Sequence, residues 1–338
     1  MNLTKVMKLI VINIIVLIVL ILGLEGISRV VFPIKETKAI FNDKDLRVRN
    51  RPFVQHHPTR GFALKPNFKN ELYTIDADGF RVVPLNVPSP DKTILCMGES
   101  TTFGWMVKDN ETYPYYLSLD LQQSGTNAKV INGGIPSYTS SQVLLYLKEI
   151  LDKKEIKPNL VLVNIMWNDI WYSSVQNWHP DILIYQKPPS WMIWLDKYSH
   201  LYHVIQKFVI STHKTKQVDV FNQKALEKYS ENLQDMIDIC KKQGIDIAFV
   251  EPPLDSDHIT QDGLHEFRIR YTKPYLIKMG QVYFDALKKV AKNNGIKVYE
   301  HHVGLKYLHQ KNLFLDALHP TPQGNKIMAD DITNQLIK

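Results

Sequence analysis

The sequence predicts an α/β fold, a doubly wound parallel sheet of five strands preceded by one membrane-spanning helix. Three observations predict it. Apolar runs of four to seven residues recur along the chain, helical patterns of fourteen or more residues separate them, and an uncharged apolar segment stands near the N-terminus. Strands that alternate with helices form parallel sheets, because each helix carries the chain back to where the next strand begins.

The apolar N-terminal segment is the first element. Leu9–Leu24 contains sixteen residues without a charge. As a helix it would be about 24 Å long, shorter than the roughly 30 Å core of a bilayer. Ile27–Phe32 adds apolar length, and Glu25 and Arg29 are spaced to pair on one helix face. We therefore expect residues 1–32 to form a transmembrane anchor.

A cleaved signal peptide is the competing interpretation of this segment. Its cleavage would need small residues in an A-x-A-like pattern, and Gly26-x-Ser28 is a weak match. An uncleaved anchor is favoured. Lys5 and Lys8 precede the apolar run but Arg29 follows it, so the charge bias that orients such helices is weak.

Residues 33–90 read as an accessory segment rich in turns. They contain seven prolines and few helical periods. We expect short strands here, such as Arg81–Leu85, packed against the domain that follows.

The alternating elements lie in residues 91–338. The predicted strands are Thr93–Met97, Lys129–Asn132, Leu160–Met166, Ile245–Val250 and Ile296–Tyr299. The predicted helices are Thr112–Gly125, Ser140–Lys154, Gln223–Gln243, Leu276–Asn294 and Pro322–Leu336. Gly244 supports the end of the third helix, because glycine commonly terminates helices.

An aromatic-rich insertion, residues 171–215, follows the third strand. It includes Trp178, Trp191, Trp194 and Tyr198. Such a segment suits a membrane interface or a lid over a substrate. A helical insertion packed on the domain is an equal alternative.

Composition excludes several functional classes. Hydrophobic residues make up 44% and charged residues 22%, as in ordinary globular proteins. The net charge of +7 comes without a run of five Lys or Arg, so no nucleic-acid partner is expected. Cys96 and Cys240 are expected to be free and buried. The histidine pairs lack accompanying carboxylates at metal-ligand spacing, so we expect no metal and no cofactor.

The residues whose side chains could carry out chemistry follow the predicted strands. Ligands of open parallel sheets bind at the carboxyl ends of the strands. Ser100 follows the first strand after Gly98-Glu99, Gly134 follows the second, and Asn168 follows the third. Asp316 and His319 stand just before the last helix.

These residue types together match the needs of acyl transfer. A serine hydroxyl is a weak nucleophile and needs an adjacent base such as imidazole. A carboxylate orients that imidazole, and amide groups stabilise the oxyanion. Each residue alone is more often a turn or cap residue. Their occurrence in this order, each at a strand end, favours a catalytic site.

With these residues the sequence resembles the SGNH/GDSL hydrolase superfamily from about residue 91 to residue 336. The resemblance implies that Ser100 is the nucleophile and that its backbone amide, with Gly134 and Asn168, forms the oxyanion hole. It implies that Asp316 orients His319, the general base. It also implies a three-layer α/β/α sandwich with a five-stranded parallel sheet of the flavodoxin-like kind.

Two positions depart from the family pattern. Glu99 stands where the family has aspartate, and Met166 stands where its third block has glycine. The second departure affects the expected shape of the pocket more than the donor. Gly61–Asn67 and Asp78–Arg81 look like the N-terminal region of membrane-anchored bacterial members, without a catalytic role.

The sequence thus predicts a serine esterase or deacylase that cleaves an O-acyl ester through an acyl-Ser100 intermediate. The expected substrate is an acyl ester, with glycan-linked and lipid-linked esters as alternatives. The expected location is a bilayer, with the catalytic domain extracytoplasmic. An O-acyltransferase with the same triad, transferring acetyl to or from a cell-surface glycan, is the first alternative. A catalytically silent surface or assembly protein is the second, and the intact Ser100 and His319 disfavour it.

Overall fold

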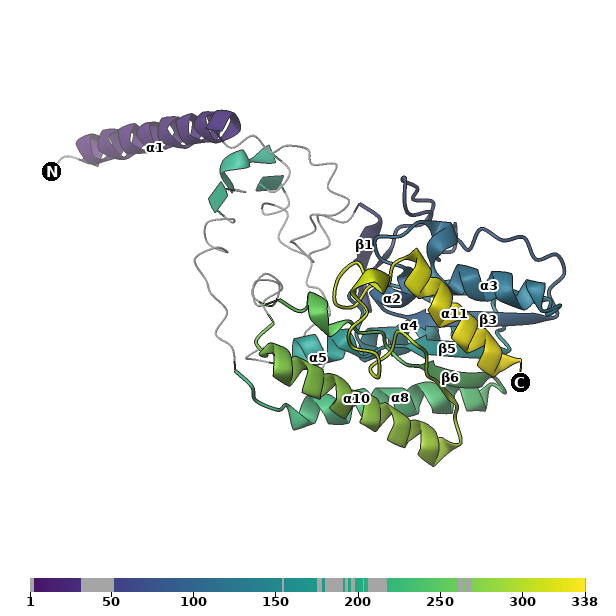
Figure 1. Ribbon diagram of the computed structural model, residues 1–338. Coiled ribbons are helices and arrows are strands. Elements are labelled where there is room, and N and C mark those ends of the chain that lie inside the picture. The colour runs from purple at the N-terminus through teal and green to yellow at the C-terminus, as the bar shows by residue number, and fades with distance from the viewer. Residues whose placement is uncertain are drawn as a thin grey trace. The chain divides into compact units, whose positions relative to one another are not determined.

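The computed structural model divides into two compact units (Figure 1), which are treated separately below. One comprises residues 1–43 and 186–214, and the other comprises residues 44–185 and 215–338. The structure describes residues 3–31, 52–153, 155–174, 178–179, 191, 194–195, 198–202, 204–205, 218–260, 264 and 269–337. Most of the predicted insertion 171–215 and residues 33–51 of the accessory segment lie outside this described part.

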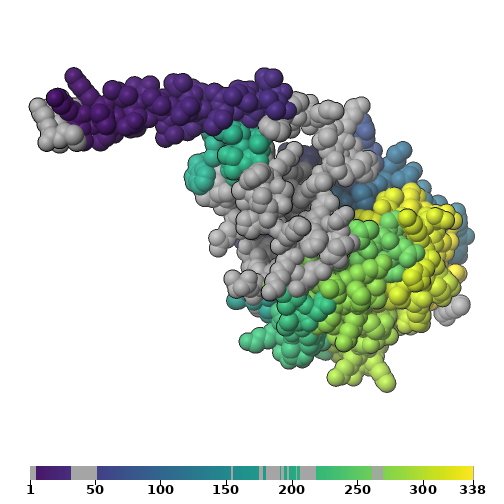
Figure 2. Space-filling model, turned by 60° about the vertical axis from the view of Figure 1, so that its left-hand side comes forward, coloured from purple at the N-terminus to yellow at the C-terminus, as the bar shows by residue number. Residues whose placement is uncertain are grey.

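The N-terminal apolar segment forms one long helix, α1 (Leu3–Val31). Residues 5–31 are long and apolar enough to cross a membrane, and of their side chains only Ser28 is buried. Figure 2 shows its sides uncovered along most of its length. The exposed side chains of α1 distinguish it from the core helix of a soluble protein, which would be buried. A signal sequence would be equally apolar and exposed. Arg29 Nε contacts Glu25 Oε1 at 2.9 Å, which confirms the predicted pairing.

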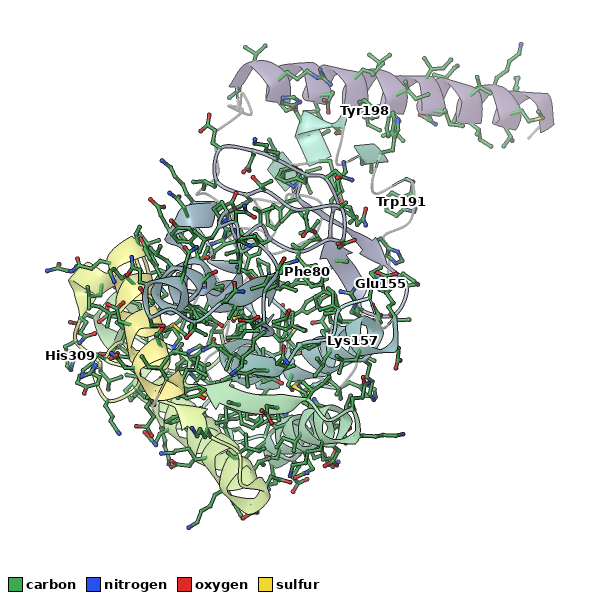
Figure 3. The ribbon with its side chains drawn as sticks, turned by 90° about the vertical axis from the view of Figure 1, so that its right-hand side faces the viewer. Phe80, Glu155, Lys157, Trp191, Tyr198 and His309 are labelled. Atoms are coloured by element: carbon green, nitrogen blue, oxygen red, sulfur yellow. The ribbon has the colours of Figure 1, made fainter. Side chains whose placement is uncertain are left out.

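Glu25 also binds residues of the aromatic-rich insertion, within the same unit. Its carboxylate accepts hydrogen bonds from Ser199 Oγ (2.8 Å) and from the backbone N–H of His200 (2.9 Å) and Leu201 (3.0 Å). Tyr198 lies close beneath α1, and its side chain is 49% exposed (Figure 3). Glu25 therefore caps the short helical turn that follows Tyr198.

The second unit contains the predicted sheet. Its five strands are all parallel, in the order β4-β3-β5-β6-β7. The order places the first strand of this sheet, β3, between the second and the third. Strands β3, β4, β5, β6 and β7 comprise Lys92–Gly98, Ala128–Gly134, Leu160–Asn164, Asp246–Val250 and Val298–Tyr299.

Helices cover both faces of the sheet, which gives the predicted three-layer sandwich (Figure 1). Side chains of β3 alternate between the faces. Ile94 and Cys96 pack with helices α3 and α11, and Leu95 and Met97 pack in the core with α4, α8 and α10. Helices α3, α4, α8, α10 and α11 comprise Tyr113–Gln123, Ser140–Lys153, Gln223–Lys242, Lys273–Asn294 and Pro322–Leu336.

All ten strands and helices predicted for residues 91–338 are confirmed, with shifted ends. β5, for example, ends at Asn164 rather than Met166, because the chain turns there into α5 (Trp167–Ser173). Cys96 and Cys240 are free and buried, as predicted. Short helical turns also connect the elements: α2 (Ser100–Phe103), η2 (Asp109–Glu111), η3 (Ser256–His258) and η4 (Lys311–Leu313).

The accessory segment differs from its prediction. A hairpin of β1 (Val54–His57) and β2 (Gly61–Leu64) was not anticipated. The predicted strand Arg81–Leu85 is wrong, since only Arg81 pairs with other strands, through isolated bridges. Pro84 has no N–H to donate, so a continuous ladder cannot form there.

Arg81 instead joins the accessory segment to the domain that contains the sheet. Its side chain is 1% exposed. The guanidinium contacts Asp109 Oδ1 at 3.0 Å and donates to the carbonyl oxygens of Phe103 (2.6 Å), Gly104 (2.5 Å) and Val107 (2.7 Å). A buried guanidinium needs such a set of acceptors, so this residue holds the turn after α2 in place.

Candidate active site

The strand order reverses at β3. The chain runs from β3 to β4 on one side of it, and the next connection leads past β3 to β5 on the other side. Such switch points are where open α/β sheets bind ligands. Ser100 lies at this end of β3, and Asn168 follows β5.

Ser100 is the first residue of α2, directly after the end of β3 and Glu99. As the first residue of a helix, it has no intrahelical acceptor for its backbone N–H. The backbone of β3 lies close to that of β5 at Gly98. An added Cβ on this residue would lie 2.2 Å from the carbonyl oxygen of Asn164. Glycine is therefore required for the strand to turn into α2 at this point.

Ser100, His319 and Asp316 form a hydrogen-bonded chain. His319 Nε2 lies 2.7 Å from Ser100 Oγ, and His319 Nδ1 lies 2.6 Å from Asp316 Oδ2. Asp316 Oδ1 accepts the backbone N–H groups of Leu318 (2.8 Å) and His319 (3.0 Å). The three residues predicted from the sequence thus meet, although 219 positions separate Ser100 from His319.

The carboxylate of Asp316 remains ionised in this setting. Burial raises its pKa, but the neighbouring His319 and the two backbone N–H donors outweigh burial and hold the pKa below its ordinary value. An ionised Asp316 accepts a hydrogen bond from His319 Nδ1–H, which leaves Nε2 to accept from the serine hydroxyl.

The loop that carries Asp316 and His319 is held by two contacts that the sequence did not indicate. The backbone N–H of Asp255, after β6, donates to the Ala317 carbonyl oxygen at 2.8 Å. Thr101 Oγ1 donates to the Leu318 carbonyl oxygen at 3.4 Å. Both contacts join residues far apart in the chain, so no local pattern could have found them.

Asn168 lies in the first turn of α5, at the carboxyl end of β5. Its Nδ2 donates one hydrogen to the Tyr138 carbonyl oxygen at 3.0 Å. An amide nitrogen carries two hydrogens, so the second is available to another acceptor.

Glu99 fixes the backbone around Asn168. Its carboxylate accepts the N–H groups of Met166 (3.4 Å), Trp167 (3.1 Å) and Asn168 (3.0 Å). Burial raises the pKa of Glu99 to about 8, an effect larger than that of the three donors, which lower it. The nearby Asp169 also contributes to the rise. The residue that departs from the family pattern is thus fully engaged inside the protein.

Gly134 does not present a free amide in this structure. Its backbone N–H donates to Asn132 Oδ1 at 3.0 Å, so it could reach another acceptor only after that bond breaks. Close packing explains why a glycine stands at this position. An added Cβ would lie 2.2 Å from the backbone nitrogen of Phe103, so β4 and α2 pack backbone to backbone.

Over the ranges that the structure describes, no group of three or more His, Cys, Asp or Glu side chains is arranged to hold a metal ion. The site brings together a serine hydroxyl, an imidazole, a carboxylate and amide donors, which are residue types that acyl transfer uses.

Comparison with known proteins identifies the family. Residues 96–327 match the model of the GDSL-like Lipase/Acylhydrolase family. The chain belongs to this family. It is therefore a GDSL-type serine hydrolase that acts on ester bonds. No curated protein matches the sequence.

Solved structures of low sequence identity are similar to this GDSL-like protein. A putative lipolytic protein of the G-D-S-L family from Desulfitobacterium hafniense is 13% identical, with 72% of this chain and 99% of that chain covered and a TM-score of 0.45. A GDSL-like lipase from Bacteroides thetaiotaomicron is 18% identical, with 75% and 92% covered and a TM-score of 0.44. A catalytic mutant of an acetylxylan esterase from Geobacillus stearothermophilus is 16% identical, with 74% and 96% covered and a TM-score of 0.45.

Proposed function

We propose that this protein is a membrane-anchored serine esterase that cleaves O-acyl esters through an acyl-Ser100 intermediate. The observation that carries the proposal is the hydrogen-bonded chain from Ser100 Oγ through His319 to Asp316, with distances of 2.7 and 2.6 Å. A serine hydroxyl becomes a competent nucleophile when an adjacent imidazole can accept its proton.

The proposed reaction has two halves. His319 Nε2 takes the hydroxyl proton as Ser100 Oγ attacks the ester carbonyl carbon, and the same proton then passes to the departing alcohol. Water next attacks the acyl-Ser100 ester with His319 again as the base, and Ser100 recovers its proton as the acid leaves. Asp316 is a positioning residue that stabilises the imidazolium formed in each half.

The proposed oxyanion donors are the backbone N–H of Ser100 and the second Nδ2 hydrogen of Asn168. Removing one such donor from a hydrolase costs about 3–4 kcal/mol of transition-state stabilisation. Gly134 would join them only after its N–H leaves Asn132, so we assign it a packing role in the resting enzyme.

We further propose that α1 remains in the mature protein and that the hydrolase domain lies on the extracytoplasmic side of the membrane. An apolar, uncovered helix supports the anchor. The substrate would then be an acyl ester on a glycan or a lipid within reach of the membrane surface.

Hydrolysis of p-nitrophenyl acetate by the full chain in detergent tests the proposal. We expect Ser100→Ala to lower kcat by about 10⁴–10⁶-fold. Ser124→Ala, which removes a serine hydroxyl at the end of α3, is the matched control and should retain activity. Equal activity of Ser100→Ala and wild type would reject Ser100 as the nucleophile. Added xylo-oligosaccharide distinguishes the transferase, because acetylated sugar would appear in place of free acetate.

A further inference from the structure

A second cavity lies away from the candidate active site. It has a volume of about 640 Å³ and opens between residues 55–87 of the accessory segment and the elements β4 and α4. Neither Ser100 nor His319 nor Asn168 lines it. Its size is within the range of about 300–1,000 Å³ that is usual for small-molecule sites.

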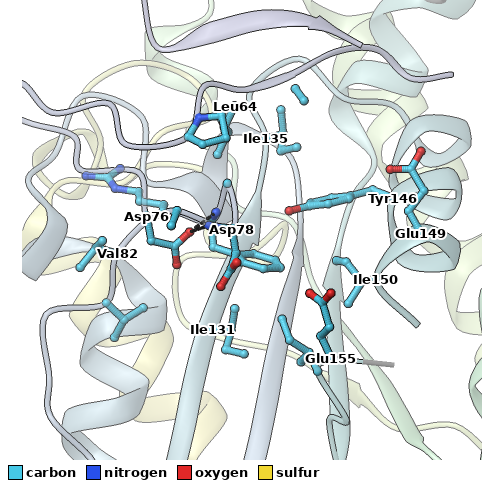
Figure 4. Close-up of a pocket in the computed structure, with 18 of the residues that line it drawn as sticks. Leu64, Asp76, Asp78, Val82, Ile131, Ile135, Tyr146, Glu149, Ile150 and Glu155 are labelled. Atoms are coloured by element: carbon cyan, nitrogen blue, oxygen red, sulfur yellow. Dashed lines mark hydrogen bonds between the residues drawn. The ribbon is translucent and has the colours of Figure 1, made fainter. Parts of the chain in front are cut away.

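The cavity combines an apolar floor with polar side chains that converge on it (Figure 4). The apolar part includes Leu64, Phe80, Ile131, Ile135 and Ile150. The polar part includes Asp76, Asp78, Tyr146, Glu149 and Glu155, most of which extend into the space in Figure 4. A few placed polar groups over an apolar surface are typical of a ligand site.

Tyr146 presents a hydrogen-bonding group to the cavity. Its side chain is 6% exposed, and its ring stacks on Phe80 at 6.0 Å and lies 4.2 Å from Arg60 Cζ. Its hydroxyl points into the cavity (Figure 4), and no residue in the described ranges forms a hydrogen bond with it. Because the hydroxyl is open to the cavity rather than sealed from solvent, a bound ligand can accept its hydrogen. Burial raises the pKa of Tyr146, so the hydroxyl stays protonated and can donate.

The carboxylates around this hydroxyl are only partly used. Asp76 Oδ1 accepts the N–H groups of Asp78 (3.0 Å) and Phe80 (2.8 Å), which leaves Oδ2 for another donor. Glu149 is paired with Arg60 at 2.9 Å. Neither Asp78 nor Glu155 forms an ion pair with a described residue. Glu155 lies at the outer edge of the fold, whereas Phe80 lies inside it (Figure 3).

The composition of the wall selects the class of ligand. The lining includes the carboxylates of Asp76, Asp78, Glu149 and Glu155 and an equal number of basic side chains, Arg60, Arg81, Lys129 and Lys153. The formal charges therefore balance, and the wall favours neither a simple anion nor a simple cation. A metal ion does not fit, because no suitable group of three ligands occurs among the described residues. Sugar hydroxyls both donate and accept hydrogen bonds, and the C–H faces of sugar rings suit an apolar floor.

We propose that this cavity binds a short oligosaccharide, with its hydroxyls on Asp76, Glu155 and the Tyr146 hydroxyl and its ring faces on Phe80 and Ile150. Ionised carboxylates make strong hydrogen bonds to hydroxyl donors, and they would supply most of the specificity. The site is separate from the triad, and the proposal stands whether or not Ser100 cleaves an ester.

Saturation-transfer NMR on the full chain tests this proposal. The protein is held in a zwitterionic detergent without a sugar headgroup, and the probes are disaccharides of glucose, galactose, mannose, xylose and N-acetylglucosamine. We expect at least one probe to bind, and its affinity to fall about tenfold in Tyr146→Phe and in Glu155→Gln. Tyr115→Phe, outside the cavity, is the matched control.

Two further readouts make the outcome decisive. Tyr146→Phe keeps the aromatic ring, so its ester hydrolysis should equal that of wild type and show that the variant is folded. A phosphonate that occupies Ser100 should leave sugar binding unchanged. The proposal is overturned if no probe binds, if binding is equal in Tyr146→Phe, if the phosphonate abolishes it, or if spermidine binds in a Tyr146-dependent way and no sugar does.

Discussion

Glu99 connects the two halves of the candidate site through a single side chain. It precedes Ser100 in the chain, and its carboxylate holds the backbone N–H groups of Trp167 and Asn168. Its side chain is 2% exposed, so these bonds are not exchanged for bonds to water. Glu99, which directly precedes Ser100, therefore fixes the backbone of Asn168.

The raised pKa of Glu99 predicts a specific pH dependence of stability. Its folded pKa of about 8 lies above the value of about 4.3 in an unfolded chain. The folded state therefore binds the proton more tightly, and this stabilisation is complete below pH 4.3 and is lost as pH rises to about 8. Glu99→Gln cannot titrate, so we expect its melting temperature to vary less than that of wild type between pH 5 and 8.

Thermal unfolding across that pH range checks this prediction. Glu155→Gln removes an exposed carboxylate and serves as the control, which should keep the wild-type slope. If Glu99→Gln also kept the wild-type slope, the assignment of the raised pKa to Glu99 would be wrong.

Sequence reasoning at the scale of residues found the groups whose spacing is local. Asp316 and His319 are three positions apart, and Ser100 follows a recognisable strand, so each could be named in advance. The partners of Gly134 and Glu99 could not be predicted. Gly134 donates to Asn132 and packs against Phe103, and such contacts depend on how β4 and α2 approach one another in space.

Among the elements, β4 and α2 approach one another at Gly134 as closely as β3 and β5 do at Gly98. Gly134→Ala would place a Cβ 2.2 Å from a backbone nitrogen of α2, which cannot yield as a flexible side chain can. We expect this change to displace Ser100, to lower kcat strongly and to destabilise the fold by about 3 kcal/mol.

Gly133→Ala is the control for this prediction, because its Cβ would meet the flexible end of Met97 at 2.8 Å. Denaturant unfolding and ester hydrolysis of both variants provide the comparison. Similar losses in both variants would show that the backbone contact of Gly134 has no special importance.

The elements that the sequence predicted were those in which apolar runs alternate with long helical patterns. The hairpin of β1 and β2 was missed, because its strands lie in the proline-rich segment, outside that alternation. Arg81–Leu85 was predicted as a strand, yet this stretch is joined to the rest of the fold by the buried guanidinium of Arg81, whose acceptors lie far from it in the chain.

The whole molecule is suited to two solvents. Residues 5–31 are apolar and mostly exposed, whereas the described residues of the second unit bury a hydrophobic cluster on each face of a sheet. We expect the full chain to float with phospholipid vesicles in a density gradient at high salt, and a chain that begins at residue 32 to remain in the dense fraction.

The mature N-terminus completes this test. Mass spectrometry of protein isolated from membranes should recover the apolar segment Leu9–Leu24. Mature protein that begins after Ser28 would contradict the anchor and support a cleaved signal peptide.

Covalent labelling of the serine tests the central claim most directly. A fluorophosphonate reacts with a serine hydroxyl only when a neighbouring base activates it. We predict one adduct per chain, mapped by peptide mass spectrometry to Ser100, absent in Ser100→Ala and formed far more slowly in His319→Ala. Labelling at another serine, or equal labelling in His319→Ala, would contradict the account.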